Sequence, residues 1–486
     1  MSRFQLSLVS HTNVGKTTLA RTLLRKDVGE VLDAAHVTET ATDYGLITTT
    51  EGDELRLWDT PGFGDSARLL RRLQGSSGAL GWFLTQVWDR YTDRPFFSSQ
   101  QALRNVRDQS DVVLYLVNAA EDPSSLGYLD AELQILGWLA KPVLVLLNQV
   151  GAPRPADAEQ AEVERWRSFL GNRAGVRDVL TFDAFARCWV QEQALLGRIA
   201  TALPEDRRAA FARIEAAWRE RNEATFRQAA KALAEQLAEI ALDAEAVPLA
   251  GFGASAKAWL RSVVTGAANG DAAVDRAMQL LAERADARIR AATDALIALH
   301  GLAGRAAGEV QSRLSGDFAL DRAASRGKAG VIGAAVSGAL GGLAADLASG
   351  GLTLGGGMIV GAVLGAAGAA GVAHGYNLLR GTDQSTVRWN DDMLDRLVVS
   401  ASLRYLAVAH FGRGRGEYVA SEYPPHWRPL VERVVLAEQP RLAQAWSLAA
   451  DGGLPATLRA ALERSLLHVL RSVLATLYPG PADTRS

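Results

Sequence analysis

Cysteine is almost absent from this chain, in which Cys188 is the one residue of its kind among 486. A single cysteine excludes an internal disulfide framework and any metal site built from several thiolates, and it is typical of a reducing compartment. The N-terminal residues lack an apolar run long enough for a secretory signal. Basic residues are mostly Arg and helical segments are Ala-rich, as in many bacterial sequences. We therefore expect a bacterial protein on the cytoplasmic side of the membrane.

An excess of charge of one sign is also missing. The sequence has 52 basic and 54 acidic side chains, which gives a formal net charge of −2. Without an excess of positive charge, the protein has no overall positive potential that would attract nucleic acid. We therefore predict no direct nucleic-acid contact. With 48% apolar and 22% charged residues, the composition also argues against long disordered segments. At about 100–200 residues per domain, the length predicts two to four folding units.

The first part of the chain alternates apolar, strand-like segments with helical patterns. The strand-like segments are Phe4–Val9, Leu55–Trp58, Asp111–Val117, Pro142–Leu147 and Val179–Phe182. This alternation predicts an α/β fold with a doubly wound, mostly parallel sheet covered by helices on both faces. After Pro204 the strand signals largely stop, and Arg207–Leu242, Ala272–Leu299 and Thr386–Tyr478 predict an all-helical region.

One motif follows the first predicted strand and precedes a predicted helix, Thr18–Arg25. It reads Ser-His-Thr-Asn-Val-Gly-Lys-Thr over residues 10–17. In such a loop, backbone N–H groups wrap phosphates, Lys16 supplies charge at the β- and γ-phosphates, and the Thr17 hydroxyl ligates Mg²⁺. The pattern begins with Gly where this chain has Ser10, and we expect the serine to weaken the loop modestly. The motif predicts a nucleotide-phosphate site.

A second motif, Asp59-Thr-Pro-Gly62, follows the predicted strand Leu55–Trp58 and begins 43 residues after Lys16. Asp59 at this strand end would hold Mg²⁺ through water, and the Gly62 N–H would reach a γ-phosphate. A β-turn alone would also explain Asp-Thr-Pro-Gly. Two such motifs at strand ends nevertheless favour phosphate binding over a turn.

The two motifs resemble those of the TrmE–Era-type branch of the translation-factor class of small P-loop GTPases. The resemblance implies hydrolysis of GTP to GDP with Mg²⁺. The family's first switch corresponds to Thr38-Glu-Thr40-Ala-Thr42. Thr40 is the expected switch threonine on Mg²⁺, with Thr38 and Thr42 as alternatives.

Two further positions bear on the mechanism that this resemblance implies. In several such enzymes, the residue matching Asn13 coordinates a catalytic K⁺; the alternative is a plain loop asparagine. Phe63 stands where Ras-like enzymes have the glutamine that orients the attacking water. The resemblance therefore implies slow hydrolysis with the water held by another group, for which Asp65 is a weak candidate. The predicted catalytic residues are Lys16, Thr40, Gly62 and Asn13.

The base-recognition motif departs most from the family, which has Asn-Lys-x-Asp after the strand Pro142–Leu147. This chain has Asn148-Gln149-Val150-Gly151, so the acceptor for guanine N1–H and its exocyclic amine is missing. Losing a buried acceptor of two hydrogen bonds removes about 1–3 kcal/mol or more of selectivity. A later loop, Asp183-Ala184-Phe185, matches the family's last motif only in Ala184. The residues predicted to hold the nucleotide are Ser10, Asn13, Val14, Gly15, Lys16, Thr17, Thr18, Asp59, Gly62, Asn148, Gln149 and Ala184, with Thr17, Thr40 and Asp59 on the metal.

These departures leave two other functions open. Ser10, Phe63 and Gly151 together are compatible with a nucleotide-binding scaffold that does not hydrolyse its ligand. Gly151 alone is compatible with an NTPase that does not select guanine, such as an ATPase.

A glycine-rich segment with 15 glycines lies within Ala329–Leu379. Small residues recur four apart, at Gly330, Ala334, Gly338 and Gly342 and again at Gly357, Gly361 and Gly365. This spacing is the packing device of membrane helices, and a helix over Gly357–Leu379 would be about 34 Å long. We predict a glycine-zipper hairpin that associates with the cytoplasmic face of the inner membrane or with a membrane protein. A packed soluble hairpin is the alternative, because Ala and Gly carry little apolar area.

The layout as a whole is similar to an uncharacterised bacterial family with a TrmE–Era-like GTPase domain fused to an Ala/Gly-rich helical domain. We predict a GTPase domain over residues 1–203, helical regions over 204–325 and 381–486, and the glycine-rich hairpin over 326–380. Nucleotide-dependent self-association is a further possibility that the sequence does not test.

Overall fold

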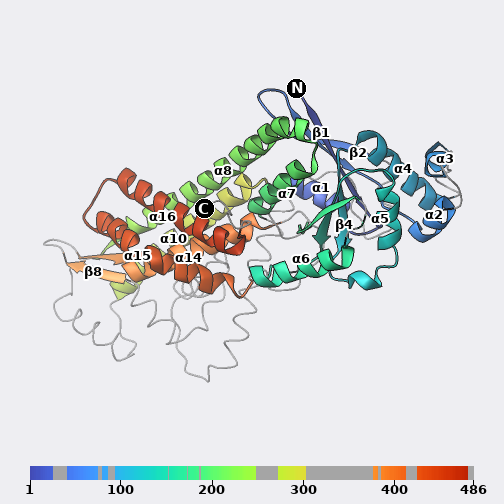
Figure 1. The fold of residues 1–486 in the computed structure, drawn as a ribbon. Helices are drawn as coiled ribbons and strands as arrows, with labels where there is room; N and C mark the ends of the chain where they lie inside the picture. Colours follow the sequence, from blue (N-terminus) through green and yellow to red (C-terminus); the bar gives the residue numbers. More distant parts are fainter. Residues whose placement is uncertain are drawn as a thin grey trace, which may run out of the picture. The chain divides into compact units, whose positions relative to one another are not determined.

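The structure, a computed structural model, describes residues 1–25, 41–74, 79–85, 93–151, 153–171, 173, 175–184, 188–247, 272–302, 376–380, 385–411 and 424–479. The chain divides into two compact units (Figure 1). Unit 1 consists of Met1–Ala224, Ala409–Val419 and Leu477–Ser486, and unit 2 of Thr225–Val408 and Ala420–Thr476. Residues 326–375 of the predicted hairpin lie outside the described residues, as do Thr38 and Thr40.

Unit 1 is built on a six-stranded sheet in the order β2-β3-β1-β4-β5-β6. The strands are β1 (Arg3–Ser10), β2 (Thr42–Thr48), β3 (Glu54–Asp59), β4 (Val112–Asn118), β5 (Val143–Asn148) and β6 (Val176–Thr181). All neighbouring pairs are parallel except β2 with β3, which is antiparallel. The predicted doubly wound, mostly parallel sheet is confirmed.

Helices cover both faces of this sheet. Side chains alternate between the two faces along each strand, so a buried strand contributes to an apolar cluster on either side. In β4, Val113, Tyr115 and Val117 enter one apolar cluster, and Val112, Leu114 and Leu116 enter the other. The first cluster contains residues of α2 (Ser66–Leu73), α3 (Ala79–Thr85), α4 (Arg94–Gln109), α5 (Leu129–Gly137) and α6 (Ala156–Leu170). The second contains residues of α1 (Lys16–Leu24), α7 (Trp189–Ala202) and the first part of α8 (Glu205–Ala241).

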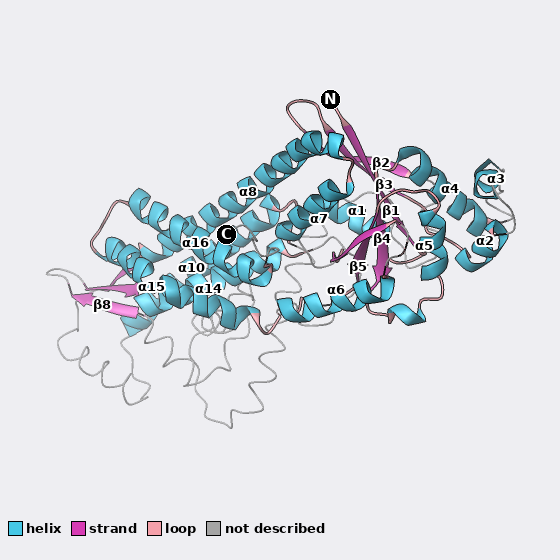
Figure 2. Cartoon of the chain, in the orientation of Figure 1, coloured by secondary structure: helices cyan, strands magenta, loops and turns pink. Residues whose placement is uncertain are grey.

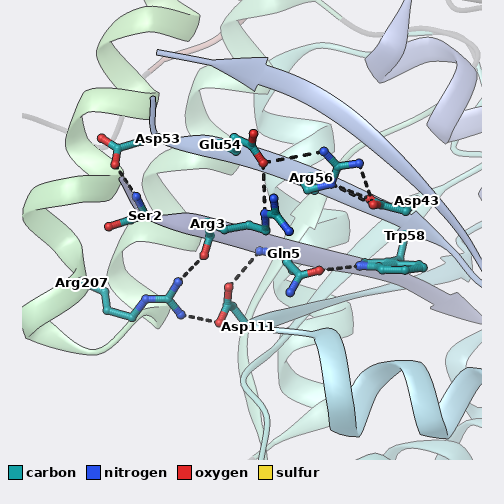
Figure 3. Close-up of polar contacts among 10 residues, drawn as sticks. All are labelled: Ser2, Arg3, Gln5, Asp43, Asp53, Glu54, Arg56, Trp58, Asp111 and Arg207. Atoms are coloured by element: carbon teal, nitrogen blue, oxygen red, sulfur yellow. Dashed lines mark hydrogen bonds and ion pairs between the residues drawn. The ribbon is translucent and has the colours of Figure 1, made fainter. Parts of the chain in front are cut away.

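Polar contacts join α8 to the amino ends of the central strands (Figure 3). Arg207 pairs with Asp111, and its Nη2 donates to the Arg3 carbonyl at 2.6 Å. Asp111 also accepts from the backbone N–H of Gln5 at 2.8 Å. These contacts occupy the amino edge of the sheet. The carboxyl edge, where parallel strands of open α/β sheets present ligand sites, carries both sequence motifs.

Unit 2 is mainly helical, as the sequence predicts. Its helices are the rest of α8, α10 (Ala272–Leu299), α14 (Asp391–Ala409), α15 (Trp427–Ala450) and α16 (Pro455–Leu477). Arg404 of α14 is fully buried; its guanidinium donates to Thr293 Oγ1 at 2.9 Å and to Gln236 Oε1 at 2.8 Å. One buried side chain thereby ties α14 to α10 and to α8.

A small antiparallel sheet, which the sequence did not predict, also belongs to unit 2 (Figure 2). Its order is β7-β9-β8, with β7 at Ala244–Val247, β8 at Tyr376–Arg380 and β9 at Ser385–Trp389. The helical predictions are therefore wrong for Tyr376–Leu379 and for Thr386–Trp389. In β9 the buried side chains are two apart, Val387 and Trp389, which is the period of a strand.

None of the described helices is both long enough and apolar enough to cross a bilayer. The membrane prediction concerns the glycine-rich segment, of which residues 326–375 lie outside the described part of the chain.

Candidate functional site: a phosphate loop and its neighbours

The phosphate loop runs from the end of β1 into α1 and requires a left-handed backbone at two positions. Asn13 has φ +65° and Gly15 has φ +96°. A Cβ at Gly15 would lie 2.8 Å from Asn148 Nδ2, so only glycine fits this close approach. Lys16, the first residue of α1, is buried with 7% exposure. The loop therefore has the backbone curvature that a phosphate cradle needs.

Ser10 adopts a backbone conformation that is open to any residue, and the expected weakening of the loop stays a prediction. It lies in β1 and is not among the described residues with positive φ, so glycine's freedom is not needed there. Its Oγ accepts from Lys16 Nζ at 2.9 Å. Burial lowers the pKa of Lys16, while Asp59 and Glu132 act in the opposite direction. The serine thus holds a desolvated ammonium group at the phosphate site.

The two predicted metal ligands within the described residues are in direct contact. Thr17 Oγ1 donates to Asp59 Oδ2 at 2.6 Å. Asp59 is 2% exposed, and its Oδ1 is buried without a hydrogen-bond partner in the part of the chain that the structure describes. An unsatisfied buried carboxylate oxygen beside a hydroxyl is a hard-oxygen donor set of the kind that Mg²⁺ prefers. The residues present therefore fit a Mg²⁺ ion.

Replacing Asp59 with asparagine tests this fit. We expect Asp59→Asn to weaken Mg²⁺-dependent nucleotide binding by about 10–100-fold. Burial raises the pKa of Asp59 above its ordinary value of 3.8. The metal-free protein therefore loses stability as the pH rises from 3.8 through the raised value, and the asparagine variant lacks this loss.

The measurements are nucleotide titrations with Mg²⁺ or EDTA, and urea unfolding at pH 7 without metal. We expect the metal-free variant to unfold at an equal or higher urea concentration than the natural protein. An unchanged difference between Mg²⁺ and EDTA would contradict the assignment of Asp59 to the metal.

The second motif lies directly against the phosphate loop. A Cβ at Gly62 would meet Thr12 Cα at 3.0 Å and Lys16 Nζ at 3.2 Å, so a glycine allows the two loops to touch. Phe63 donates its N–H to the Ser10 carbonyl at 2.9 Å, and its ring is fully buried in the sheet core. Asp65 is the N-cap of α2 and accepts from Arg68 N at 2.9 Å. The Asp65 carboxylate therefore caps α2, and its role in holding water stays a prediction.

A buried carboxylate that the sequence analysis did not single out joins both loops. Glu132 of α5 is fully buried. Its Oε1 lies 2.7 Å from His11 Nδ1 and accepts from Ser66 Oγ at 2.6 Å, and its Oε2 accepts from Tyr115 OH at 2.7 Å. His11 also stacks on Tyr128 with ring centroids 4.1 Å apart. Glu132 thereby connects the phosphate loop, the start of α2 and the sheet.

The sequence contained one signal for Glu132. It shares a helix face with Leu129, Leu133 and Leu136, all of which are buried. An acidic residue on an apolar helix face requires a polar partner.

The base-recognition segment connects three loops through Asn148, which is fully buried. Its Nδ2 donates to the Val14 carbonyl at 2.6 Å, and its Oδ1 accepts from Ala184 N at 2.8 Å. Gln149 has φ +58°, and Gly151 has φ +84°. The structure therefore brings the predicted residues Val14, Asn148 and Ala184 together beside the phosphate loop.

The remaining predicted residues are placed less directly. Thr18 is buried in α1, and its backbone carbonyl accepts from Thr22 Oγ1 at 3.0 Å. Asn13 is exposed at the turn of the loop. Of the three switch threonines considered, Thr42 is the one described; it opens β2 and is exposed.

Two family models match successive parts of the chain. The family model for a domain of unknown function, DUF3482, matches residues 171–468. The model for a 50S ribosome-binding GTPase matches residues 5–149. No curated protein matches the chain.

Several solved structures are similar to this chain. Aquifex aeolicus Era bound to GDP and aluminium fluoride is 18% identical over 42% of this chain and 58% of its own, with a TM-score of 0.31. Era in complex with MgGDPNP and a segment of 16S ribosomal RNA is 17% identical over the same shares, also with a TM-score of 0.31. A bacterial selenocysteine-specific elongation factor is 13% identical over 38% of this chain and 26% of its own, with a TM-score of 0.24. The chain thus spans little more than half of the Era structures.

Proposed function

We propose a function from the premise that this chain belongs to the family with the domain of unknown function DUF3482 and carries a P-loop GTPase domain before it. We infer that the N-terminal domain binds GTP with Mg²⁺, hydrolyses it slowly to GDP and acts as a switch for the helical region. The observation that carries this proposal is the contact of Thr17 with Asp59, next to the buried ammonium of Lys16.

The chain's own residues account for binding and positioning. Lys16 places a desolvated positive charge at the loop, where polyphosphate oxygens give charge-assisted hydrogen bonds. Gly62 brings backbone within reach of the same point, since even a Cβ there would lie 3.2 Å from Lys16 Nζ. Thr17 and Asp59 would hold Mg²⁺, which when bound neutralises charge on the phosphate oxygens. Ordering of these loops by the γ-phosphate, and their relaxation after hydrolysis, would give two states.

We propose further that the enzyme is of the TrmE–Era type and uses K⁺ near Asn13. The exposed position of Asn13, at the left-handed turn of the loop, supports this assignment. Phe63 supports it as well, because a buried phenyl ring cannot orient a water molecule. A cation at the loop would supply charge that an arginine finger supplies in other GTPases.

One experiment separates the main possibilities. The full chain is titrated calorimetrically with GTPγS and with ATPγS in Mg²⁺, and GTP turnover is then measured in K⁺ and in Na⁺. We expect a guanine preference of about tenfold or more and faster turnover in K⁺. Equal affinities would indicate an NTPase without guanine selectivity.

A scaffold that does not hydrolyse GTP is the second candidate, and the burial of Phe63 is the observation that favours it. Tight binding without turnover in either salt would establish it.

We propose that the helical region reports the nucleotide state to a membrane or to a membrane-bound partner at the cytoplasmic face of the inner membrane. The four-residue spacing of small side chains in the glycine-rich segment supports this proposal.

A further inference from the structure

The base-recognition segment lacks an acceptor at Gly151, and the space beside this residue is open. A Cβ added to Gly151 would have no neighbour within 4 Å. The backbone there turns sharply, because Gln149 and Gly151 both have positive φ. Asn148, just before them, is held between the phosphate loop and the loop that follows β6. The base-recognition segment is therefore an ordered loop that lacks a carboxylate at Gly151.

A carboxylate from that neighbouring loop lies beside this position. Asp183 Oδ2 accepts from the backbone N–H of Val150 at 2.8 Å. The next residue, Ala184, donates its N–H to Asn148 Oδ1 at 2.8 Å. The first bond places the Asp183 side chain against the residue that precedes Gly151, and the second joins the backbone of the same loop to Asn148. Asp183 is 2% exposed, so hydrogen bonds that it accepts compete little with water.

The chemistry of a carboxylate at this point suits guanine. A carboxylate has two oxygens with about four lone-pair sites, so it can accept several hydrogen bonds at once. Guanine presents two adjacent donors, N1–H and the 2-amino group. Adenine has an acceptor at N1 and no 2-amino group, and xanthine has a carbonyl oxygen in place of that amine. An acceptor fixed in a dry site discriminates strongly against such analogues, because the mismatched group is left unpaired.

We propose that Asp183 is the guanine-specifying residue of this chain and substitutes for the carboxylate that Gly151 lacks. This inference rests on the proposed function, since it concerns the same nucleotide site. The acceptor for guanine would then come from the loop that follows β6, which is hydrogen-bonded to the base-recognition segment. Glu159 of α6 is a second acid in this region. Burial raises the pKa of Glu159 and the charge of Asp183 acts in the same direction, whereas the backbone N–H and the charge of Arg154 act in the opposite direction.

The test is a change of base preference in the full chain. Asp183→Asn keeps a side-chain oxygen for Val150 N and replaces the other oxygen with an amide donor. Dissociation constants for GDP and XDP are measured by calorimetry in Mg²⁺. We expect the natural protein to prefer GDP, and Asp183→Asn to lose about tenfold or more in GDP affinity while gaining in XDP affinity. Glu159→Gln is the matched control and should keep the natural preference.

A folded Asp183→Asn protein with the natural preference for GDP would overturn the proposal. A second measurement does not depend on any variant. IDP lacks the 2-amino group, so the natural protein should bind it about tenfold more weakly than GDP. Equal affinities for GDP and IDP would also overturn the assignment, although nucleotide binding would stand. Failure of the natural protein to bind any nucleotide would instead overturn the proposed function.

Discussion

Lys16→Ala is expected to weaken GTP binding by about a hundredfold or more, the largest effect of any single change at the phosphate loop. Lys16 is buried, and its ammonium group donates to Ser10 Oγ. Burial lowers the pKa of Lys16, which means that the protein without nucleotide holds this charge at a cost. Polyphosphate oxygens would compensate for that cost. Removing the ammonium therefore reduces nucleotide affinity far more than it reduces the stability of the free protein.

The measurement is a calorimetric titration with GTPγS, together with urea unfolding of the free protein. Lys141→Ala is the matched control, because Lys141 precedes β5 at the amino edge of the same sheet and donates to the Ser110 carbonyl at 2.7 Å. The control should bind GTPγS normally.

Sedimentation with lipid vesicles, with and without GTPγS, then tests the predicted membrane association of the helical region. If GTPγS changes the vesicle binding of the natural protein, the same change in Lys16→Ala would contradict coupling between the phosphate loop and the helical region.

The sequence was sufficient to predict that both motifs follow strands of one mostly parallel sheet, and the structure adds the order of the strands. β1 and β3 are parallel neighbours, with Leu8 opposite Asp59. Residues that follow the two strands must therefore lie close together at one sheet edge, whatever the details of the loops. The effect of Ser10 was not predictable in this way. Loss of glycine suggests a weaker loop, but the contact with Lys16 Nζ depends on where the first turn of α1 places that side chain.

The strands that the sequence analysis missed are short or lie at the edge of a sheet. β2 is an edge strand whose burial does not alternate, and β7 has four residues. In β8 and β9, pairing rather than local composition decides the conformation: Tyr376 lies opposite Trp389 and Leu378 opposite Val387. β9 pairs with β7 as well, more than a hundred residues away in the sequence. Such partners cannot be read from a local pattern.

Glu132→Ala is expected to lower the free energy of unfolding by about 3–5 kcal/mol. Glu132 is fully buried and receives hydrogen bonds from Ser66 and Tyr115. His11 contacts the same oxygen as Ser66. Removing the carboxylate leaves the buried hydroxyl groups of Ser66 and Tyr115 without this acceptor. Because His11 and Ser66 belong to the phosphate loop and the start of α2, GTP affinity should fall along with stability.

Two further variants separate the hydrogen bonds from the charge. Glu132→Gln keeps a carbonyl oxygen for His11 and Ser66, and its amide can donate to Tyr115 OH, so we expect a loss of only about 1 kcal/mol. Asp130→Ala is the control on the same helix: its carboxylate is 72% exposed and pairs with Arg173 at 2.7 Å. An exposed pair of this kind contributes about 0.2–1 kcal/mol. Urea unfolding and GTPγS titration of the three variants give the comparison. Equal losses for Glu132→Ala and Asp130→Ala would show that Glu132 does not link the two loops. A large loss in Glu132→Gln would instead place the effect in the buried negative charge, which also acts on Lys16.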